Sequence, residues 1–87
     1  MLDLNNTYVG MNVKLNRPVR VNAYPEPTHI YEEGKVGRIL DMYDVRTGRD
    51  SYSMMDIEFE DGSCLFRQCE SDYDEVTNSE MIKRHNR

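Results

Sequence analysis

The side chains best suited to chemistry are few and lie far apart in this chain. The histidines are His29, beside a segment that contains two prolines, and His85, near the last residue, while the cysteines are Cys64 and Cys69. Nucleophilic or acid–base catalysis needs such groups within hydrogen-bond distance of one another. The chain also lacks the Gly-x-Ser-x-Gly elbow, the phosphate-binding loop and the His-Glu-x-x-His helix. We therefore expect a protein that is not an enzyme and needs no cofactor.

Metal binding is the second kind of chemistry that the residue types suggest. Asp72, Asp74 and Glu75 offer oxygen ligands of the sort that Ca²⁺ and Mg²⁺ take. Their spacing lacks the central glycine and the distal glutamate of an EF-hand loop, so a solvated acidic loop is the expected structure. Cys64 and Cys69 have no second Cys or His pair at zinc-ligand spacing. We expect two reduced thiols and no metal site.

Charge is distributed unevenly along the 87 residues, whose net charge is −5. Residues 1–55 carry as many acidic as basic side chains, residues 56–75 carry eight acidic side chains against Arg67, and residues 76–87 are basic. No apolar run approaches the roughly 20 residues of a membrane span, and the N-terminal residues lack the basic and apolar regions of a signal peptide. We expect one cytoplasmic domain over residues 1–87, without membrane contact.

Alternation of apolar and polar residues predicts strands in the first half of the chain. Residues 13–16 and 19–21 alternate as one strand, whose buried face would consist of Val13, Leu15, Val19 and Val21. Pro18 cannot donate a hydrogen bond to a neighbouring strand, so the strand either bends there or lies at an edge. Residues 33–43 form the next strand, in which a bulge at Gly37 would bring Val36 and Ile39 to one face. Residues 45–50 are polar and predict a hairpin loop.

The strongest local signal is the clean alternation over residues 52–60, followed by an Asp-Gly pair at 61–62. This pair is typical of a two-residue type I′ turn. The register that such a turn imposes places Cys64 and Phe66 in the core. On the opposite face it pairs Asp56 with Arg67 as a cross-strand ion pair.

Less regular structure is expected at the two ends of the chain. Residues 1–7 are predicted to be loose, and residues 69–76 to form an acidic loop. A Thr-Asn-Ser-Glu capping box at 77–80 then predicts a short helix over 77–85.

The pattern of strands and turns resembles a small SH3-like barrel. The resemblance covers about residues 9–68 and lies in the segments 9–15, 34–39 and 57–62. The segment Gly-Lys-Val-Gly-Arg-Ile at 34–39 is similar to the glycine-rich turn of KOW-type modules, which bind nucleic acids or ribosomal and transcription partners. The resemblance implies a mainly β, partly open barrel of four to five antiparallel strands with a short C-terminal helix. The chain departs from the KOW pattern in charge, because members that bind RNA are usually basic.

Protein binding is the function that the surface pattern favours. Carboxylates repeat on the outward side of the predicted hairpin and in the loop after it, and such a ridge of negative charge suits a partner with a basic surface. The ridge consists of Asp56, Glu58, Glu60, Glu70, Asp72, Asp74 and Glu75. Tyr73, between two aspartates, is the expected aromatic anchor, and its competing role is to pack over the open end of the barrel. We expect an adaptor or inhibitor, similar to accessory proteins of phages and mobile elements, that masks a nucleic-acid-binding protein.

Two other interpretations stay open. In the first, Lys14, Arg17, Arg20, Lys35 and Arg38 converge and bind nucleic acid, with Tyr24 and Tyr31 stacked on bases. The acidic balance of the chain opposes this alternative. In the second, the charged face only keeps the domain in solution. An open sheet edge would also allow pairing with a second copy.

Overall fold

The computed structural model describes residues 1–22 and 27–77, and strands are their main regular structure. Their elements are η1 (Leu4–Asn6), β1 (Asn12–Leu15), β2 (Val19–Val21), β3 (His29–Tyr31), β4 (Val36–Thr47), β5 (Asp50–Phe59), β6 (Cys64–Gln68), η2 (Glu70–Asp72) and β7 (Tyr73–Glu75). Both η1 and η2 are single 3₁₀ turns. Among the described residues, no helix has the length and apolar character needed to cross a membrane.

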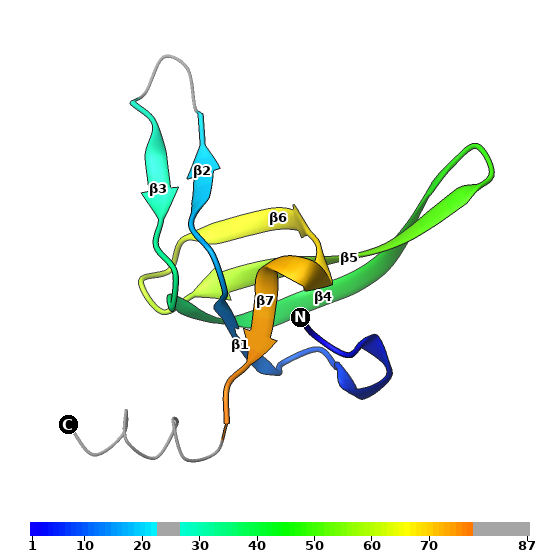
Figure 1. The fold of residues 1–87 in the computed structure, drawn as a ribbon, viewed down its shortest axis with the longest axis horizontal. Coiled ribbons are helices and arrows are strands. Elements are labelled where there is room, and N and C mark those ends of the chain that lie inside the picture. Colours follow the sequence, from blue (N-terminus) through cyan, green and yellow to red (C-terminus); the bar gives the residue numbers. More distant parts are fainter. Residues whose placement is uncertain (23–26, 78–87) are drawn as a thin grey trace.

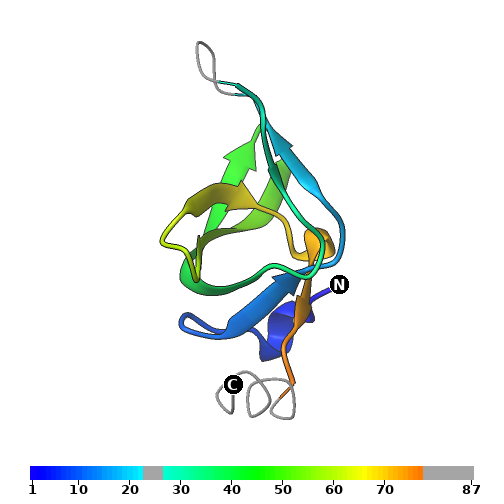
Figure 2. The same cartoon turned by 90° about the vertical axis from the view of Figure 1, so that its left-hand side faces the viewer.

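The strands form two antiparallel sheets. The larger sheet has five strands in the order β6-β5-β4-β1-β7, and the smaller sheet consists of β2 and β3. Figure 1 shows the β2–β3 hairpin standing away from the larger sheet, and Figure 2 shows it from the side. The expected mainly β fold with antiparallel strands is therefore confirmed, and the sheet is not closed into a barrel.

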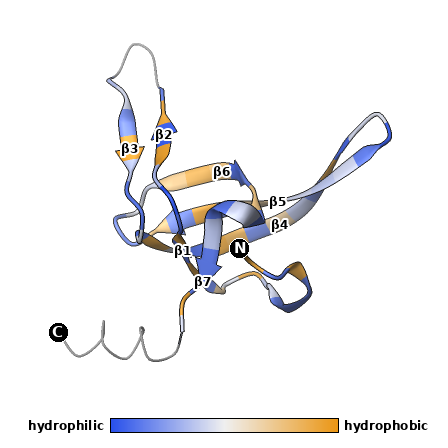
Figure 3. Ribbon diagram, in the orientation of Figure 1, coloured by the Kyte–Doolittle hydropathy of each residue, from blue (hydrophilic) through white to orange (hydrophobic). Residues whose placement is uncertain are grey.

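The core lies on one side of the larger sheet and is closed by the smaller one. Each strand supplies alternate residues to it, because successive side chains of a strand point to opposite faces. The buried cluster consists of Leu2, Met11, Val13, Leu15, Tyr31, Ile39, Met55, Ile57, Phe59, Leu65 and Tyr73, with Val19, Val21 and Met42 packed against it. The alternation along β2 is visible as alternating colours in Figure 3. The predicted shared side of Val13, Leu15, Val19 and Val21 is thus confirmed, although β1 and β2 belong to different sheets.

Gly37 does not form the predicted bulge. It pairs in register with Val13 and Phe59, and a Cβ at this position would lie 2.7 Å from the backbone oxygen of Glu58. Glycine therefore permits a close approach of β4 and β5. The bulge lies between Ile39 and Asp41 instead. Because Gly37 and Ile39 face the core, Val36 points to the other face, and the expectation that Val36 and Ile39 share a face is wrong.

The hairpin between β5 and β6 has a three-residue loop, so the predicted register is wrong by one residue. Gly62 N–H donates to the Phe59 carbonyl, and Phe59 N–H donates to the Ser63 carbonyl. Gly62 has a φ of 87°, as the last residue of a three-residue hairpin loop requires. The Asp61 carboxylate accepts from the Ser63 backbone N–H at 3.0 Å and stabilises this turn.

The shifted register exchanges the residues of β6 between the two faces. Glu58 pairs with Cys64 and Ile57 with Leu65. Leu65 is therefore buried, while Phe66 is 64% exposed. Cys64 is half-buried on the face away from the core, contrary to the predicted burial.

The segment 45–50 is also more regular than expected. Strands β4 and β5 continue through it in register to the pair Thr47–Asp50, and the turn itself consists of Gly48 and Arg49. Gly48 has a φ of 63°, which glycine adopts without strain. The two strands thus form a long ribbon that projects beyond the rest of the sheet (Figure 1).

The ends of the described chain are held to the sheet. Residues 1–7, expected to be loose, contain η1, and Leu2 is buried and donates its backbone N–H to the Glu70 carbonyl at 3.1 Å. The expected acidic loop 69–76 contains η2 and β7, and β7 pairs with β1. The predicted helix 77–85 lies outside the described residues, except for Thr77.

Candidate functional site

The carboxylates predicted on β5 and at its end lie on the side of the larger sheet that faces away from the core. We call this side the outer face. Asp56 and Glu58 alternate with the buried residues Met55, Ile57 and Phe59, and Glu60 follows with the same spacing. Asp56, Glu58 and Glu60 therefore share one face, as predicted, because successive side chains of a strand point to opposite faces.

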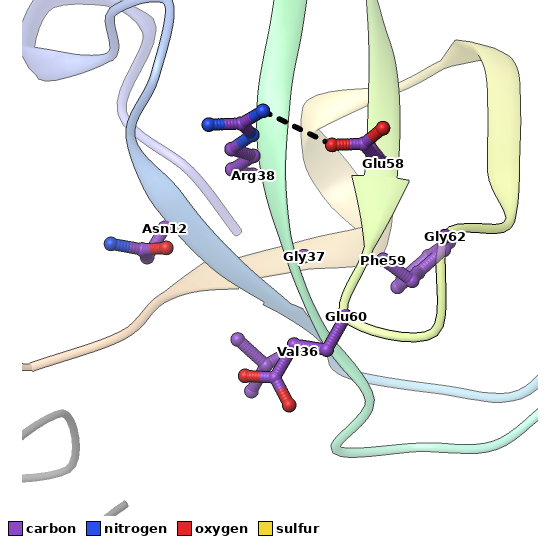
Figure 4. A pocket seen from close by; sticks show the side chains of 8 residues that line it. All are labelled: Asn12, Val36, Gly37, Arg38, Glu58, Phe59, Glu60 and Gly62. Atoms are coloured by element: carbon purple, nitrogen blue, oxygen red, sulfur yellow. Dashed lines mark hydrogen bonds and ion pairs between the residues drawn. The ribbon is translucent and has the colours of Figure 1, made fainter. Parts of the chain in front are cut away.

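Basic side chains interrupt this row on the neighbouring strands. Arg38 of β4 pairs in register with Glu58, and its Nη2 lies 3.2 Å from Glu58 Oε1 (Figure 4). Lys14 of β1 also lies on the outer face, where it pairs in register with Val36. Lys35 lies instead on the core side, with its Nζ 5.0 Å from the centre of the Tyr31 ring and 2.7 Å from Asp61 Oδ2. The hydrogen bond from Lys35 is the main reason why the pKa of Asp61 is well below its usual value. The outer face is therefore a mixed surface of alternating charges and not a uniform negative ridge.

A shallow hollow of about 280 Å³ opens in the outer face beside this row. Its lining consists of Asn12, Val36, Gly37, Arg38, Glu58, Phe59, Glu60 and Gly62. Two carboxylates and one guanidinium thus surround a hollow that also contains the apolar side chain of Val36. The net negative charge and the apolar contact suit a cationic side chain with an aliphatic stem.

Asp56 contacts a tyrosine and a backbone amide in place of the predicted arginine side chain. Its Oδ1 accepts from the Tyr43 hydroxyl at 2.8 Å and from the Arg67 backbone N–H at 3.2 Å. The hydrogen bond to Asp56 raises the pKa of Tyr43. Arg67 has a φ of 56°, which aims its N–H at the carboxylate. The predicted pairing of the two residues is present, but through the backbone of Arg67.

The carboxylates after β6 interact with cations of the chain itself. Asp72 forms an ion pair with Arg17. Asp74 Oδ1 lies 2.5 Å from the α-amino group of Met1 and accepts from Asn16 Nδ2 at 3.4 Å, and these interactions lower its pKa. These predicted partner-binding aspartates therefore also tie η2 and β7 to the residues that follow β1 and to the N-terminus.

The two other acidic residues predicted there differ in their surroundings. Glu70 lies in η2, half-buried, and its carbonyl accepts from Leu2. Glu75 is exposed at the end of β7 and alternates with Asp74, so the two side chains point to opposite faces. Among the described residues, no group of three or more acidic, cysteine or histidine side chains could hold a metal ion.

Tyr73 is a core residue, so the expectation that it anchors a partner on the free surface is wrong. Its side chain is 0% exposed, and its hydroxyl donates to Gln68 Oε1 at 2.9 Å. Burial raises its pKa strongly. Strand β7 pairs with β1 and so carries Tyr73 under the sheet, a long-range pairing that the local sequence does not reveal.

The five basic residues of the alternative interpretation do not gather on one face, although Lys14 of β1 and Arg38 of β4 share the outer face. Arg17, Lys35 and Arg38 are each engaged in an ion pair, while Lys14 lies on β1 and Arg20 on β2 of the other sheet. The expected convergence assumed that the first two strands are neighbours in one sheet, which they are not. Tyr31 is buried against Phe59, with ring centroids 5.1 Å apart, and is not available to stack on a base. Tyr24 lies outside the described residues.

The β4–β5 ribbon carries partly exposed apolar residues that the sequence pattern was not expected to place on a surface. Tyr43, Val45, Tyr52 and Met54 lie on its outer face, and Phe66 of β6 points the same way as the outer-face residues. The prediction of a loop at 45–50 and of a buried Phe66 removed these residues from consideration. One signal in the sequence could have revealed them. Apolar residues alternate with polar ones at 43 and 45 before the Gly48-Arg49 turn, and in the same way at 52 and 54 after it.

Comparison of the chain with protein-family models, with curated proteins and with solved structures gave no significant match. The functional conclusions below therefore rest on the residues and their geometry.

Proposed function

We propose that this chain is a non-enzymatic protein-binding module that acts in the cytoplasm as an adaptor or inhibitor. The observation that carries the proposal is the row of Asp56, Glu58 and Glu60 on the outer face, beside a hollow that two of these carboxylates line. The partner is a protein with a basic surface, and a protein that binds nucleic acid has such a surface.

Binding would proceed through a lysine or arginine of the partner. Its stem would contact Val36 in the hollow and its cationic head would lie between Glu58 and Glu60. Arg38 already interacts with Glu58, but this pair is exposed, and exposed pairs contribute only about 0–1 kcal/mol. An incoming cation can therefore share or take the place of Arg38 at small cost.

Nucleic acid is the less favoured partner. Binding to phosphates needs a cluster of basic side chains whose charge is not already compensated. Arg17, Lys35 and Arg38 are compensated by Asp72, Asp61 and Glu58.

The test is affinity capture from a lysate, with and without nuclease, at low and at high salt. The variant Glu58→Gln/Glu60→Gln removes the two carboxylates of the hollow, and the matched control Glu32→Gln/Glu33→Gln removes two exposed carboxylates from the turn before β4. Glutamine is preferred to lysine because a lysine at position 58 would face Arg38. We expect the first variant to bind its partner at least about tenfold more weakly, which corresponds to about 1.4 kcal/mol, and the control to bind like the wild type.

Thermal unfolding of both variants should stay close to that of the wild type, because the changed side chains lie outside the core. Equal binding by the wild type and the first variant would contradict the proposed site. Capture of nucleic acid in place of a protein would support the alternative interpretation.

A further inference from the structure

The distal half of the β4–β5 ribbon is amphipathic, although no core lies beneath it. The register pairs Tyr43 with Met54 and Val45 with Tyr52 on the outer face. We call these four residues the ribbon stripe. Tyr52 is 48% exposed, and the other three are half-buried. The opposite face of the same segment carries only polar residues, namely Asp44, Arg46, Ser51 and Ser53.

A folded chain is expected to place its apolar side chains on the face toward the core. In the distal half of the ribbon they lie on the outer face instead. On the core side the last hydrophobic pair is Met42–Met55, and beyond it the residues are polar. The ribbon stripe instead continues the outer face, and the exposed ring of Phe66 on β6 lies beyond Asp56 on that face. Contiguous apolar side chains on an exposed surface mark interaction sites more often than scattered ones do.

Carboxylates border the ribbon stripe at both ends. Asp41 and Asp56 pair in register at the end near the core, and Asp50 lies at the tip opposite Thr47. Each end also has one nearby arginine, because Arg49 lies in the turn and the charge of Arg67 acts on Tyr43. The three carboxylates outnumber these two cations, so the border of the ribbon stripe is acidic on balance. An apolar stripe whose border carries a net negative charge is complementary to an apolar segment flanked by basic residues.

We propose that the ribbon stripe binds an apolar segment of the partner protein that is flanked by lysine or arginine residues. The apolar side chains of that segment lie on Tyr43, Val45, Tyr52 and Met54, and its basic flanks lie near Asp41, Asp56 and Asp50. The inference rests on the proposed function and names the chemistry of the partner segment.

A second copy of this chain is a poorer occupant of the same face. In a two-fold packing of ribbon on ribbon, residues of one patch meet the same patch of the other copy. Two borders of net negative charge would then lie close together, and like charges across an interface are unfavourable. A partner of opposite charge has no such penalty.

Amide chemical-shift mapping on the full chain tests the proposal with synthetic peptides as probes. One peptide has a leucine- and phenylalanine-containing centre flanked by lysines. The second has the same centre flanked by glutamates, and the third has a serine centre flanked by lysines. We expect the first peptide alone to shift the signals of residues 41–56.

Two variants sharpen the result. Tyr52→Ser/Met54→Ser should weaken binding of the first peptide about tenfold or more. Ile30→Ser is the matched control, because Ile30 is also 48% exposed but lies on β3 of the other sheet. It should leave binding unchanged.

Each other outcome identifies what has failed. No shift with the first peptide, or equal shifts with the serine-centred peptide, would overturn the ribbon stripe as a site. Shifts confined to Glu58 and Glu60 would also overturn it, but would leave the proposed function intact. Shifts of these signals that depend on protein concentration, without any peptide, would overturn the proposed peptide binding and indicate that the ribbon stripe binds a second copy. Binding of the first peptide that is unaffected by Glu58→Gln/Glu60→Gln would support this inference, because no residue of the ribbon stripe lines the hollow.

Discussion

Asp61 illustrates how a single side chain sets both a turn and its response to pH. Its carboxylate accepts from Lys35 Nζ at 2.7 Å, from Ser63 Oγ at 2.6 Å and from the Ser63 backbone N–H at 3.0 Å. All three donors favour the ionised form, so the pKa of Asp61 is lowered from its ordinary value of 3.8. The loop that defines the β5–β6 register is therefore stabilised by an ionised side chain.

The first prediction concerns stability in acid. A carboxylate whose pKa is lowered in the folded state stabilises the protein above its ordinary pKa, and this stabilisation is lost as the pH falls through the lowered value. We expect the free energy of unfolding to decrease below pH 3.8 in the wild type and to decrease less steeply in Asp61→Asn. Urea unfolding at a series of pH values measures this slope.

Lys35→Gln is the companion variant, because it removes the cation and leaves the carboxylate. It should also flatten the acid limb, since the pKa of Asp61 then returns toward its ordinary value. Identical acid limbs in all three proteins would show that the Lys35–Asp61 contact has no part in acid stability.

At the scale of elements, the β5–β6 hairpin decides which residues reach each face. A two-residue turn buries Phe66, while the three-residue loop buries Leu65 and exposes Phe66. A shift of one residue moves every side chain of a strand to the other face. The consequences of the register are therefore large and can be measured.

The second prediction tests this register by comparing two neighbouring residues. Leu65→Ala should lower the free energy of unfolding by about 2–5 kcal/mol, because it opens a cavity in the core. Phe66→Ala should change it by less than about 0.5 kcal/mol, as exposed positions usually do. Chemical denaturation of both variants against the wild type measures the difference. The opposite order of the two effects would support the two-residue turn.

The same hairpin shows how far sequence reasoning reaches. The period of two over residues 52–60 correctly separates Met55, Ile57 and Phe59 from Asp56 and Glu58. The loop length was misjudged because Asp-Gly fits both hairpin types, and the hydrogen bonds of Asp61 to Ser63 decide between them. Local pattern thus predicts the faces of a strand, but the loop sets the register of the next one.

Long-range pairing is the second limit of the sequence. The short segment 73–75 has no strand signal of its own, yet it pairs with β1 and buries Tyr73. Likewise, nothing local shows that β1 and β2 enter different sheets, which separates the basic residues of the first strands. The fold class was predictable from the sequence, whereas the exposure of Tyr73 and the clustering of charges depended on tertiary contacts.

At the scale of the whole molecule, charge and apolar surface are arranged around one sheet. The outer face carries the Arg38–Glu58 pair and the hollow near the centre, and the ribbon stripe toward the tip of β4 and β5. One partner protein could therefore contact both regions at once, with basic side chains at the hollow and an apolar segment on the ribbon. Contacts at two regions add specificity, because a wrong partner must match both patterns.

The two cysteines provide a built-in probe of this arrangement. Cys64 lies half-buried on the outer face, where it pairs in register with Glu58, and Cys69 is exposed at the start of η2. Neither forms a disulfide. A partner on the outer face would cover the first thiol and leave the second one accessible.

The most direct measurement is the alkylation rate of each thiol in the free chain and in its complex with the captured partner, followed by mass spectrometry. Binding through the outer face predicts that the partner slows the alkylation of Cys64 by about tenfold or more, while Cys69 reacts at an unchanged rate. An unchanged rate at Cys64 in a fully formed complex would contradict docking on the outer face.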